Sequence, residues 1–207
     1  MFRIENKVLE DDLKYKGETI LKYKIQYPQI FNKKRFNKEN FDKAISLQKE
    51  AESKIFEDAK NSYEYNKKNG YPIMVFEVYL SYEITQNDDR IVSLYYDEYR
   101  FKGGAHGNTI RTSQTWDMIN ERKIKLDEWF KNPNYVSKII TYINQQIKKN
   151  IENGKSIYFD NYCCLTSEYF RVENYYVKKG VLVIYYQQYD IAPYSSGIIN
   201  FELRKRG

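Results

Sequence analysis

The sequence predicts an α+β fold, mainly an antiparallel sheet with two amphipathic helices packed on sheet faces. Segments in which apolar and polar residues alternate recur along the chain, and this period of two is typical of strands with one buried face. Two longer segments carry apolar residues every three or four positions, which is the period of a helix packed on one side. We expect two parts, residues 1–104 and 105–207, that together form one globule.

The strands are expected to begin early in the chain. Alternating residues predict a short strand at residues 2–8 and a second at residues 21–27, which Pro28 ends. Residues 73–94 read as a hairpin whose turn is the polar run 86–89. Further elements are expected as a turn at 120–123, helical turns at 127–130 and 166–170, a hairpin of residues 173–177 and 181–186, and a last strand at 198–203.

Both helices are predicted from apolar stripes. The first has Asn37 or Asn40 as its cap, and Gly70 closes it. The second covers roughly residues 134–153, and Gly154 stops it. The stripe of the first helix consists of Phe41, Ala44, Ile45, Gln48, Ala51, Ile55, Phe56, Ala59 and Tyr63.

A glycine-rich corner, residues 103–107, lies at the centre of the chain between two predicted strands. Gly103, Gly104 and Gly107 can adopt a positive φ or let another part of the chain come close, which residues with a Cβ do poorly. The following strand is expected at residues 108–116. The corner also contains His106, which is the only histidine of the chain.

The composition excludes several classes of protein. Of the 207 residues, 17% are aromatic and 22 are tyrosine, which is unlike a disordered chain. No segment approaches the roughly 18 consecutive apolar residues of a membrane-spanning helix, and no signal segment opens the chain. Two interpretations therefore stay open: a cytoplasmic protein, or a chain that begins after a removed anchor.

The chain is basic, with a formal net charge of +6 and an isoelectric point of about 9.0. No nucleic-acid-binding motif accompanies this charge, so we expect no specific nucleic-acid partner. Attraction to anionic surfaces such as wall polymers or membranes stays open. The two cysteines, Cys163 and Cys164, are adjacent and lack metal-ligand spacing, so we expect two buried or half-buried thiols, no disulfide and no metal site.

Three pieces of the sequence together resemble a two-part bacterial envelope module. They are the glycine corner with Tyr99 before it, the pair Trp116-Asp117 followed by Leu126, Trp129 and Phe130, and the late run 185–197 with its Asp-Ile-Ala-Pro-Tyr. In this order they are similar to the extracellular region of RsiV-type anti-sigma factors, which sense lysozyme. They are also similar to the module that precedes the catalytic domain in PdaC-type peptidoglycan deacetylases.

The resemblance implies a non-catalytic binding or sensing module on the outer side of a Gram-positive-type cell, with no catalytic residues and no cofactor. Its implied partners are a cell-wall polymer, peptidoglycan, or a wall-directed protein such as lysozyme. This chain is basic, as the common lysozymes are, and like charges oppose association. An anionic wall polymer therefore fits the charge better.

The candidate ligand-binding or partner-binding residues are His106, Asn108, Trp116, Asp190 and Tyr194. His106 either contacts a ligand from an exposed corner or tucks under the corner and bonds a backbone carbonyl, and the second use is the commoner one for a lone histidine. Asp190 and Tyr194 either form part of a recognition face or support the glycine corner. We expect the corner and the late loop to lie side by side.

No catalytic constellation is evident in the sequence. Adjacent acids such as Asp97 with Glu98 point to opposite faces of a strand, so they cannot act on one bond. Asp117 and Asp190 could converge only through the fold. The leading hypothesis is thus a non-catalytic envelope binding module. The alternatives are a hydrolase acting on cell-wall glycan and a purely structural domain.

Overall fold

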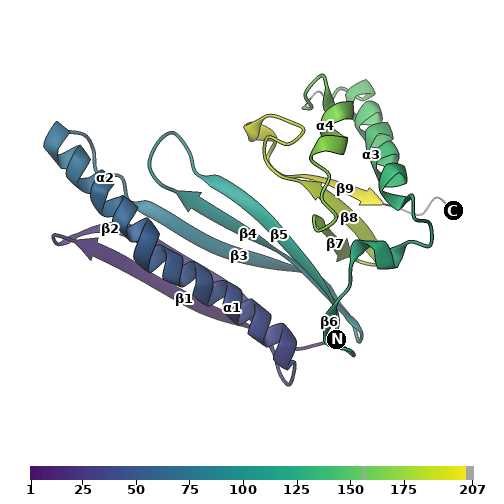
Figure 1. The fold of residues 1–207 in the computed structure, drawn as a ribbon, viewed down its shortest axis with the longest axis horizontal. Helices are drawn as coiled ribbons and strands as arrows, with labels where there is room; N and C mark the ends of the chain where they lie inside the picture. Colours follow the sequence, from purple (N-terminus) through teal and green to yellow (C-terminus); the bar gives the residue numbers. More distant parts are fainter. Residues whose placement is uncertain (156, 204–207) are drawn as a thin grey trace. The chain divides into compact units, whose positions relative to one another are not determined.

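The computed structural model describes residues 1–155 and 157–203, and it confirms the α+β class (Figure 1). The strands are β1 (Ile4–Tyr15), β2 (Glu18–Ile30), β3 (Phe76–Asn87), β4 (Ile91–Phe101), β5 (Asn108–Asp117), β6 (Arg122–Lys123), β7 (Tyr175–Lys178), β8 (Val181–Tyr186) and β9 (Ile199–Leu203). The helices are α1 (Lys34–Glu50), α2 (Phe56–Asn69), α3 (Tyr135–Glu152) and α4 (Tyr162–Glu168). Shorter helical segments are the π-helical η1 (Ala51–Ile55) and the 3-10 turns η2 (Leu126–Trp129) and η3 (Tyr194–Ser196).

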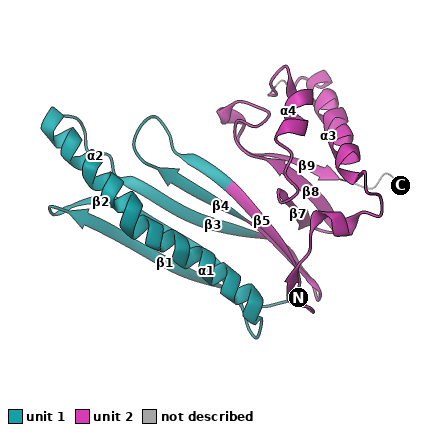
Figure 2. Cartoon of the chain, viewed as in Figure 1, with its two compact units in different colours: residues 1–83, 96–110 teal, residues 84–95, 111–207 magenta. Residues whose placement is uncertain are grey.

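The chain divides into two compact units (Figure 2). Unit 1 comprises residues 1–83 and 96–110, and unit 2 comprises residues 84–95 and 111–207. The boundaries fall inside β3, β4 and β5, so each of these strands contributes one part to each unit. The units are interleaved along the chain, whereas the expected parts 1–104 and 105–207 are consecutive.

The larger sheet has six strands in the order β1-β2-β3-β4-β5-β6. β2 and β3 run parallel, with Leu21 opposite Phe76, and the helices α1 and α2 provide the long connection that a parallel pair needs. β2 also pairs with β1 and continues past Pro28, which lies opposite Asn6. The expectation that Pro28 ends the strand is wrong, because the pairing with β3 stops at Ile25 and the proline is not required to donate to a third strand.

The first helical segment begins earlier than the sequence predicts. α1 starts at Lys34, and Asn37 does not cap it but bonds both backbone groups of Ile30 at 2.8 Å. Gly70 ends α2 with φ +71°, as predicted. Phe41, which the pattern places in the apolar stripe, is 46% exposed. The buried stripe runs through α1, η1 and α2 and consists of Phe36, Asn40, Ala44, Leu47, Ala51, Ile55, Ala59 and Tyr63.

Unit 2 contains a second, antiparallel sheet in the order β7-β8-β9, with α3 packed on it. The predicted helix and hairpin of this region are confirmed. The buried core here joins three isoleucines of α3 to rings on β8 and β9, and it includes Ile139, Ile143, Ile147, Tyr186 and Phe201. The expected burial of the two cysteines is wrong. The short helix α4 buries Thr166 and leaves both thiols exposed.

Within unit 2, a clamp centred on Arg111 joins β5 to Gln187, the residue that follows β8. The backbone N–H of Arg111 donates to Gln187 Oε1 at 2.9 Å, and Gln187 Nε2 donates to the carbonyl of Arg111 at 2.7 Å. The guanidinium lies 3.6 Å from the ring centroid of Tyr95 on β4. We call this set of contacts the Arg111 clamp.

A buried hydrogen bond ties α1 to β4 within unit 1. Tyr96 is 2% exposed and donates its hydroxyl to Asn40 Oδ1 at 2.5 Å, while Asn40 Nδ2 donates to the carbonyl of Phe36 at 2.7 Å. Burial raises the pKa of Tyr96, so the phenol stays neutral and acts as a donor. The side-chain amide of Asn40 therefore satisfies two groups that have no access to water.

We expect Asn40→Ala to lower the free energy of unfolding by about 1–3 kcal/mol, because it leaves the Tyr96 hydroxyl buried without an acceptor. Tyr96→Phe removes the donor and should cost about 1 kcal/mol. Urea unfolding of the wild type, both single variants and the double variant measures the coupling. Additive effects of the two substitutions would contradict this role for the hydrogen bond.

Candidate functional site

The glycine corner lies between β4 and β5 in unit 1. Gly103 and Gly104 have φ values of +85° and +103°, which confirms the expected need for glycine there. Gly107 is required for a different reason, because a Cβ at this position would lie 2.4 Å from Cζ of Tyr99. The ring of Tyr99 stacks on Tyr79 with 6.1 Å between centroids. The corner is therefore shaped by close contact with an aromatic ring.

His106 and Asn108 are both exposed at this corner. The Nδ1 atom of His106 lies 3.0 Å from the carbonyl oxygen of Gly107, so the imidazole bonds a backbone carbonyl, as the structural interpretation expects. The ring does not tuck under the corner, however. Both side chains are accessible to a partner.

Trp116 is buried, with 3% of its surface exposed. Its indole N–H donates to Gln114 Oε1 at 2.8 Å, and the ammonium of Lys123 lies 5.9 Å from the ring centroid. The indole is therefore packed in the core with its donor satisfied. In this structure Trp116 is a buried residue near the end of β5.

The late loop, residues 187–197, belongs to unit 2. Asp190 is partly buried and its Oδ2 accepts the backbone N–H of Gln187 at 2.7 Å, so it closes a turn of its own loop. Burial raises the pKa of Asp190, and the Gln187 hydrogen bond opposes this shift. The rings of Tyr194 and Tyr189 lie 5.6 Å apart, and Tyr189 is 56% exposed.

The predicted site residues are thus divided between the units: His106 and Asn108 lie in unit 1, and Trp116, Asp190 and Tyr194 lie in unit 2. Their assignment to one binding face stays a prediction. The same holds for the expected neighbourhood of the corner and the late loop.

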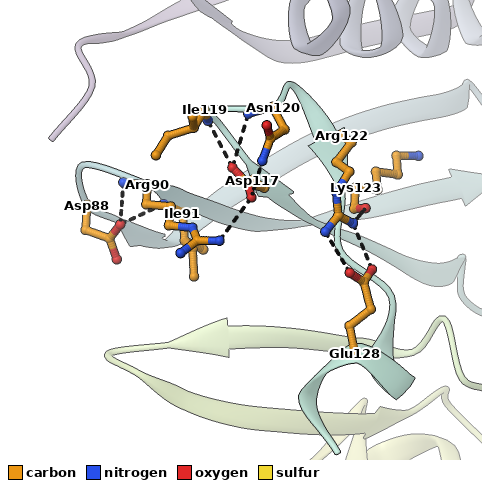
Figure 3. Close-up of polar contacts among 9 residues, drawn as sticks. All are labelled: Asp88, Arg90, Ile91, Asp117, Ile119, Asn120, Arg122, Lys123 and Glu128. Carbon is orange, nitrogen blue, oxygen red and sulfur yellow. Dashed lines mark hydrogen bonds and ion pairs between the residues drawn. The ribbon is translucent and has the colours of Figure 1, made fainter.

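Asp117 lies at the centre of a network of polar contacts (Figure 3). It is 1% exposed, and its Oδ1 accepts the backbone N–H groups of Ile119 and Asn120 at 3.0 and 3.2 Å. Its Oδ2 accepts from Asn120 Nδ2 at 3.0 Å and from Arg90 Nη2 at 3.4 Å. Burial opposes ionisation, but these donors outweigh it and lower the pKa of Asp117. The carboxylate is engaged on both oxygens and holds the turn after β5.

A second carboxylate in Figure 3 plays a similar part. Glu128 on η2 receives two bonds from Arg122, at 2.9 and 2.7 Å, and one from the backbone N–H of Lys125 at 2.8 Å. These contacts lower the pKa of Glu128 to about 2. The pair connects β6 to the helical turn that follows it.

Three hollows of unit 2 are lined by residues of α3 and of the segments around it. Their volumes are about 380, 440 and 450 Å³. The first and second share Tyr142, and the first and third share Tyr135. We call them together the α3 hollows. The first is lined by Phe130, Lys131, Asn132, Tyr135, Lys138, Ile139, Tyr142 and Leu203.

The lining of the first hollow combines flat rings with cations. Phe130 and Tyr135 stack with 5.1 Å between centroids and 12° between planes, and Lys131 and Lys138 are exposed beside them. Rings bind apolar faces of ligands, and ammonium groups bind carboxylate or phosphate. The sequence motifs do not point to this hollow. The only feature of the sequence that relates to it is that Tyr135, Lys138 and Tyr142 lie next to the apolar stripe of the helix.

Over the residues that the structure describes, no group of three or more His, Cys, Asp or Glu side chains is arranged to hold a metal ion. The same residues contain no helix that is long and apolar enough to cross a membrane.

Comparison with known families assigns both halves of the chain. The model described as "Deacetylase PdaC" matches residues 15–109, and the model described as "Protein of unknown function (DUF3298)" matches residues 128–205. The chain therefore matches a PdaC model in its N-terminal part and a DUF3298 model in its C-terminal part, in the order of the two-part module that the sequence motifs indicate. The first and second α3 hollows lie within the second matched segment, and the third extends beyond it to β5 and β6.

Among individual proteins, the chain is similar to the peptidoglycan-N-acetylmuramic acid deacetylase PdaC of Bacillus subtilis (strain 168). The two are 24% identical over 177 residues, which is 82% of this chain but only 34% of that protein. Crystal structures of DUF3298 family proteins from Bacteroides fragilis and Pseudomonas aeruginosa share the fold. Their TM-scores are 0.69 and 0.63 at 16% and 17% identity, and each match covers 98% of this chain and 90% of the other.

We expect Gly107→Ala to lower the free energy of unfolding by about 1–3 kcal/mol, because its Cβ collides with the ring of Tyr99. Replacing the ring in the double variant Gly107→Ala/Tyr99→Leu should recover part of this loss. Thermal unfolding followed by circular dichroism measures both. An equal loss with and without the ring would show that the collision is not the cause.

Asp117→Asn should destabilise the chain by about 1–3 kcal/mol at pH 7, since the charged acceptor of four hydrogen bonds is lost. The folded-state pKa lies below the usual 3.8, so the contribution of Asp117 is present above that value and disappears as the pH falls through the folded-state pKa. Urea unfolding between pH 7 and pH 2 should show the variant and the wild type converging in acid. The exposed Asp160→Asn serves as the control, and a constant difference across the pH range would contradict the assignment.

Proposed function

We propose that this chain is a non-catalytic binding module of the cell envelope that recognises peptidoglycan. The observation that carries the proposal is the first α3 hollow, where stacked rings lie beside two lysines. The similarity of the chain to part of a peptidoglycan deacetylase supports an extracytoplasmic location of the chain in the envelope. The chain spans about a third of that relative, so the deacetylase activity of the whole relative is not assigned to it.

The chemistry of peptidoglycan fits this hollow. Its sugar rings have apolar faces that stack on aromatic side chains, and its stem peptides carry carboxylates. Tyr135 and Tyr142 supply half-buried rings, and Lys131 and Lys138 supply exposed cations within the same lining. A formal net charge of +6 also favours an anionic polymer over a basic protein such as lysozyme.

The state of the acids supports binding without catalysis. A glycan hydrolase needs two carboxyl groups aimed at one bond across a gap that holds substrate. Asp117 has both oxygens occupied by neighbouring donors, and Asp190 closes a turn of its own loop. Both acids that the sequence left as candidates therefore have structural partners.

We expect Tyr142→Ala and Lys138→Glu each to weaken binding to purified, insoluble peptidoglycan roughly fivefold to tenfold, through lost ring contact and reversed charge. Sedimentation of the chain with increasing amounts of peptidoglycan measures the bound fraction. Tyr65→Ala on α2 and Lys148→Glu outside the hollow are matched controls that should bind as the wild type does.

The same mixtures, assayed for released acetate and for new reducing ends, should show neither. Wild-type protein that does not sediment with peptidoglycan would refute the proposal. If Tyr142→Ala and Lys138→Glu bind as well as the controls, the first α3 hollow is not the binding site. Turnover of the glycan would contradict the non-catalytic assignment.

A further inference from the structure

One end of unit 1 presents an exposed aromatic ring beside basic residues. Phe31 follows the last residue of β2 and is 93% exposed, the highest exposure among the large hydrophobic side chains described. Asn32 turns the chain with φ +58°, and α1 then begins at Lys34. Single exposed apolar side chains are common on protein surfaces, but a fully exposed ring beside a cluster of cations combines the two features that favour docking on an anionic interface.

The start of β1 lies at the same end, because Ile4 pairs with Ile30. Lys33 Nζ lies 5.4 Å from the ring centroid of Phe2, which places the two segments in contact. We call this end the β2–α1 tip (lower end of α1 in Figure 1). It comprises Phe2, Arg3, Phe31, Asn32, Lys33, Lys34 and Arg35.

The charge of the tip is strongly positive. Arg3, Lys34 and Arg35 are exposed, and the first turn of α1 holds no acidic residue. The positive end of the helix dipole adds to these cations. Of the nearby acids, Glu5 is paired with Lys7 at 3.1 Å and Asp42 with Lys38 at 2.5 Å, and Glu39 is exposed one helical turn after Arg35. The four cations of the tip, Arg3, Lys33, Lys34 and Arg35, outnumber this acid and keep the tip positive.

We propose that the β2–α1 tip docks on the surface of an anionic phospholipid bilayer, with Phe31 inserted among the lipids and the basic residues at the headgroups. A soluble polyanion would satisfy the cations but would offer no apolar phase for the ring, whereas a bilayer interface offers both. This surface lies in unit 1, and the proposal does not depend on peptidoglycan binding by unit 2.

Co-sedimentation with vesicles of phosphatidylcholine containing a quarter phosphatidylglycerol tests the proposal, with pure phosphatidylcholine as the neutral reference. Wild-type chain should bind the anionic vesicles and bind the neutral ones at least about tenfold less. Phe31→Ser should weaken binding to anionic vesicles roughly tenfold. Lys34→Glu/Arg35→Glu should weaken it by a similar factor or more.

The matched controls are Ile119→Ser, an exposed apolar residue in unit 2, and Lys148→Glu/Lys149→Glu on α3. Ile119→Ser should bind within about twofold of the wild type. Lys148→Glu/Lys149→Glu lowers the net charge of the whole chain, and its binding should fall clearly less than that of Lys34→Glu/Arg35→Glu. In addition, the emission of Phe31→Trp should shift to shorter wavelength with anionic vesicles. The proposal would be overturned if the wild type did not bind the anionic vesicles, or if Phe31→Ser bound them as well as the wild type does.

Discussion

The Arg111 clamp is the contact on which the architecture of unit 2 depends. It fixes one residue of β5 to Gln187 through both backbone groups, and it stacks the guanidinium on a ring from β4. Because Gln187 also donates its backbone N–H to Asp190, the clamp continues into the late loop. Replacing this arginine by lysine would keep the charge but lose the planar stacking surface. The conformation of the late loop thus follows from its attachment to the six-stranded sheet.

The local part of the fold was predictable because it is encoded in short-range periodicity. Helix and strand order, the stop at Gly70 and the hairpin across Lys179-Gly180 all follow from patterns within a few residues. The errors have tertiary causes. Pro28 is tolerated because the pairing of β2 with β3 stops at Ile25, three residues before the proline. Asn37 does not cap α1 because its side chain bonds the backbone of Ile30 at the end of β2. The sequence near Pro28 and Asn37 does not show where the pairing with β3 stops or that Asn37 bonds Ile30.

The candidate site was predictable only in part, for the same reason. The glycines of the corner indicate unusual backbone geometry in the sequence. The need for Gly107, however, arises from the ring of Tyr99, which lies eight residues earlier. Trp116 belongs to a recognisable motif, yet its burial and its bond to Gln114 arise from packing. The first α3 hollow is formed by the segment after η2, by α3 and by Leu203 of β9, which lies far from them in sequence. An apolar stripe identifies the buried side of such a helix and says nothing about a hollow beside it.

The distribution of charge is consistent with the two binding surfaces that we propose. On β1 and β2, Lys22 faces Asp12 and Lys24 faces Glu10 in register, each pair at 3.0 Å. Such exposed pairs add little to stability, but they neutralise the face on which they lie. The excess positive charge is thereby left for places where acids are few, including the start of α1 and the lysines of the first hollow. Both surfaces combine cations with rings, but they differ in shape. The proposed ligand of the hollow is a sugar ring laid against stacked side chains, and the proposed partner of the tip, with its exposed Phe31, is the apolar interior of a bilayer surface.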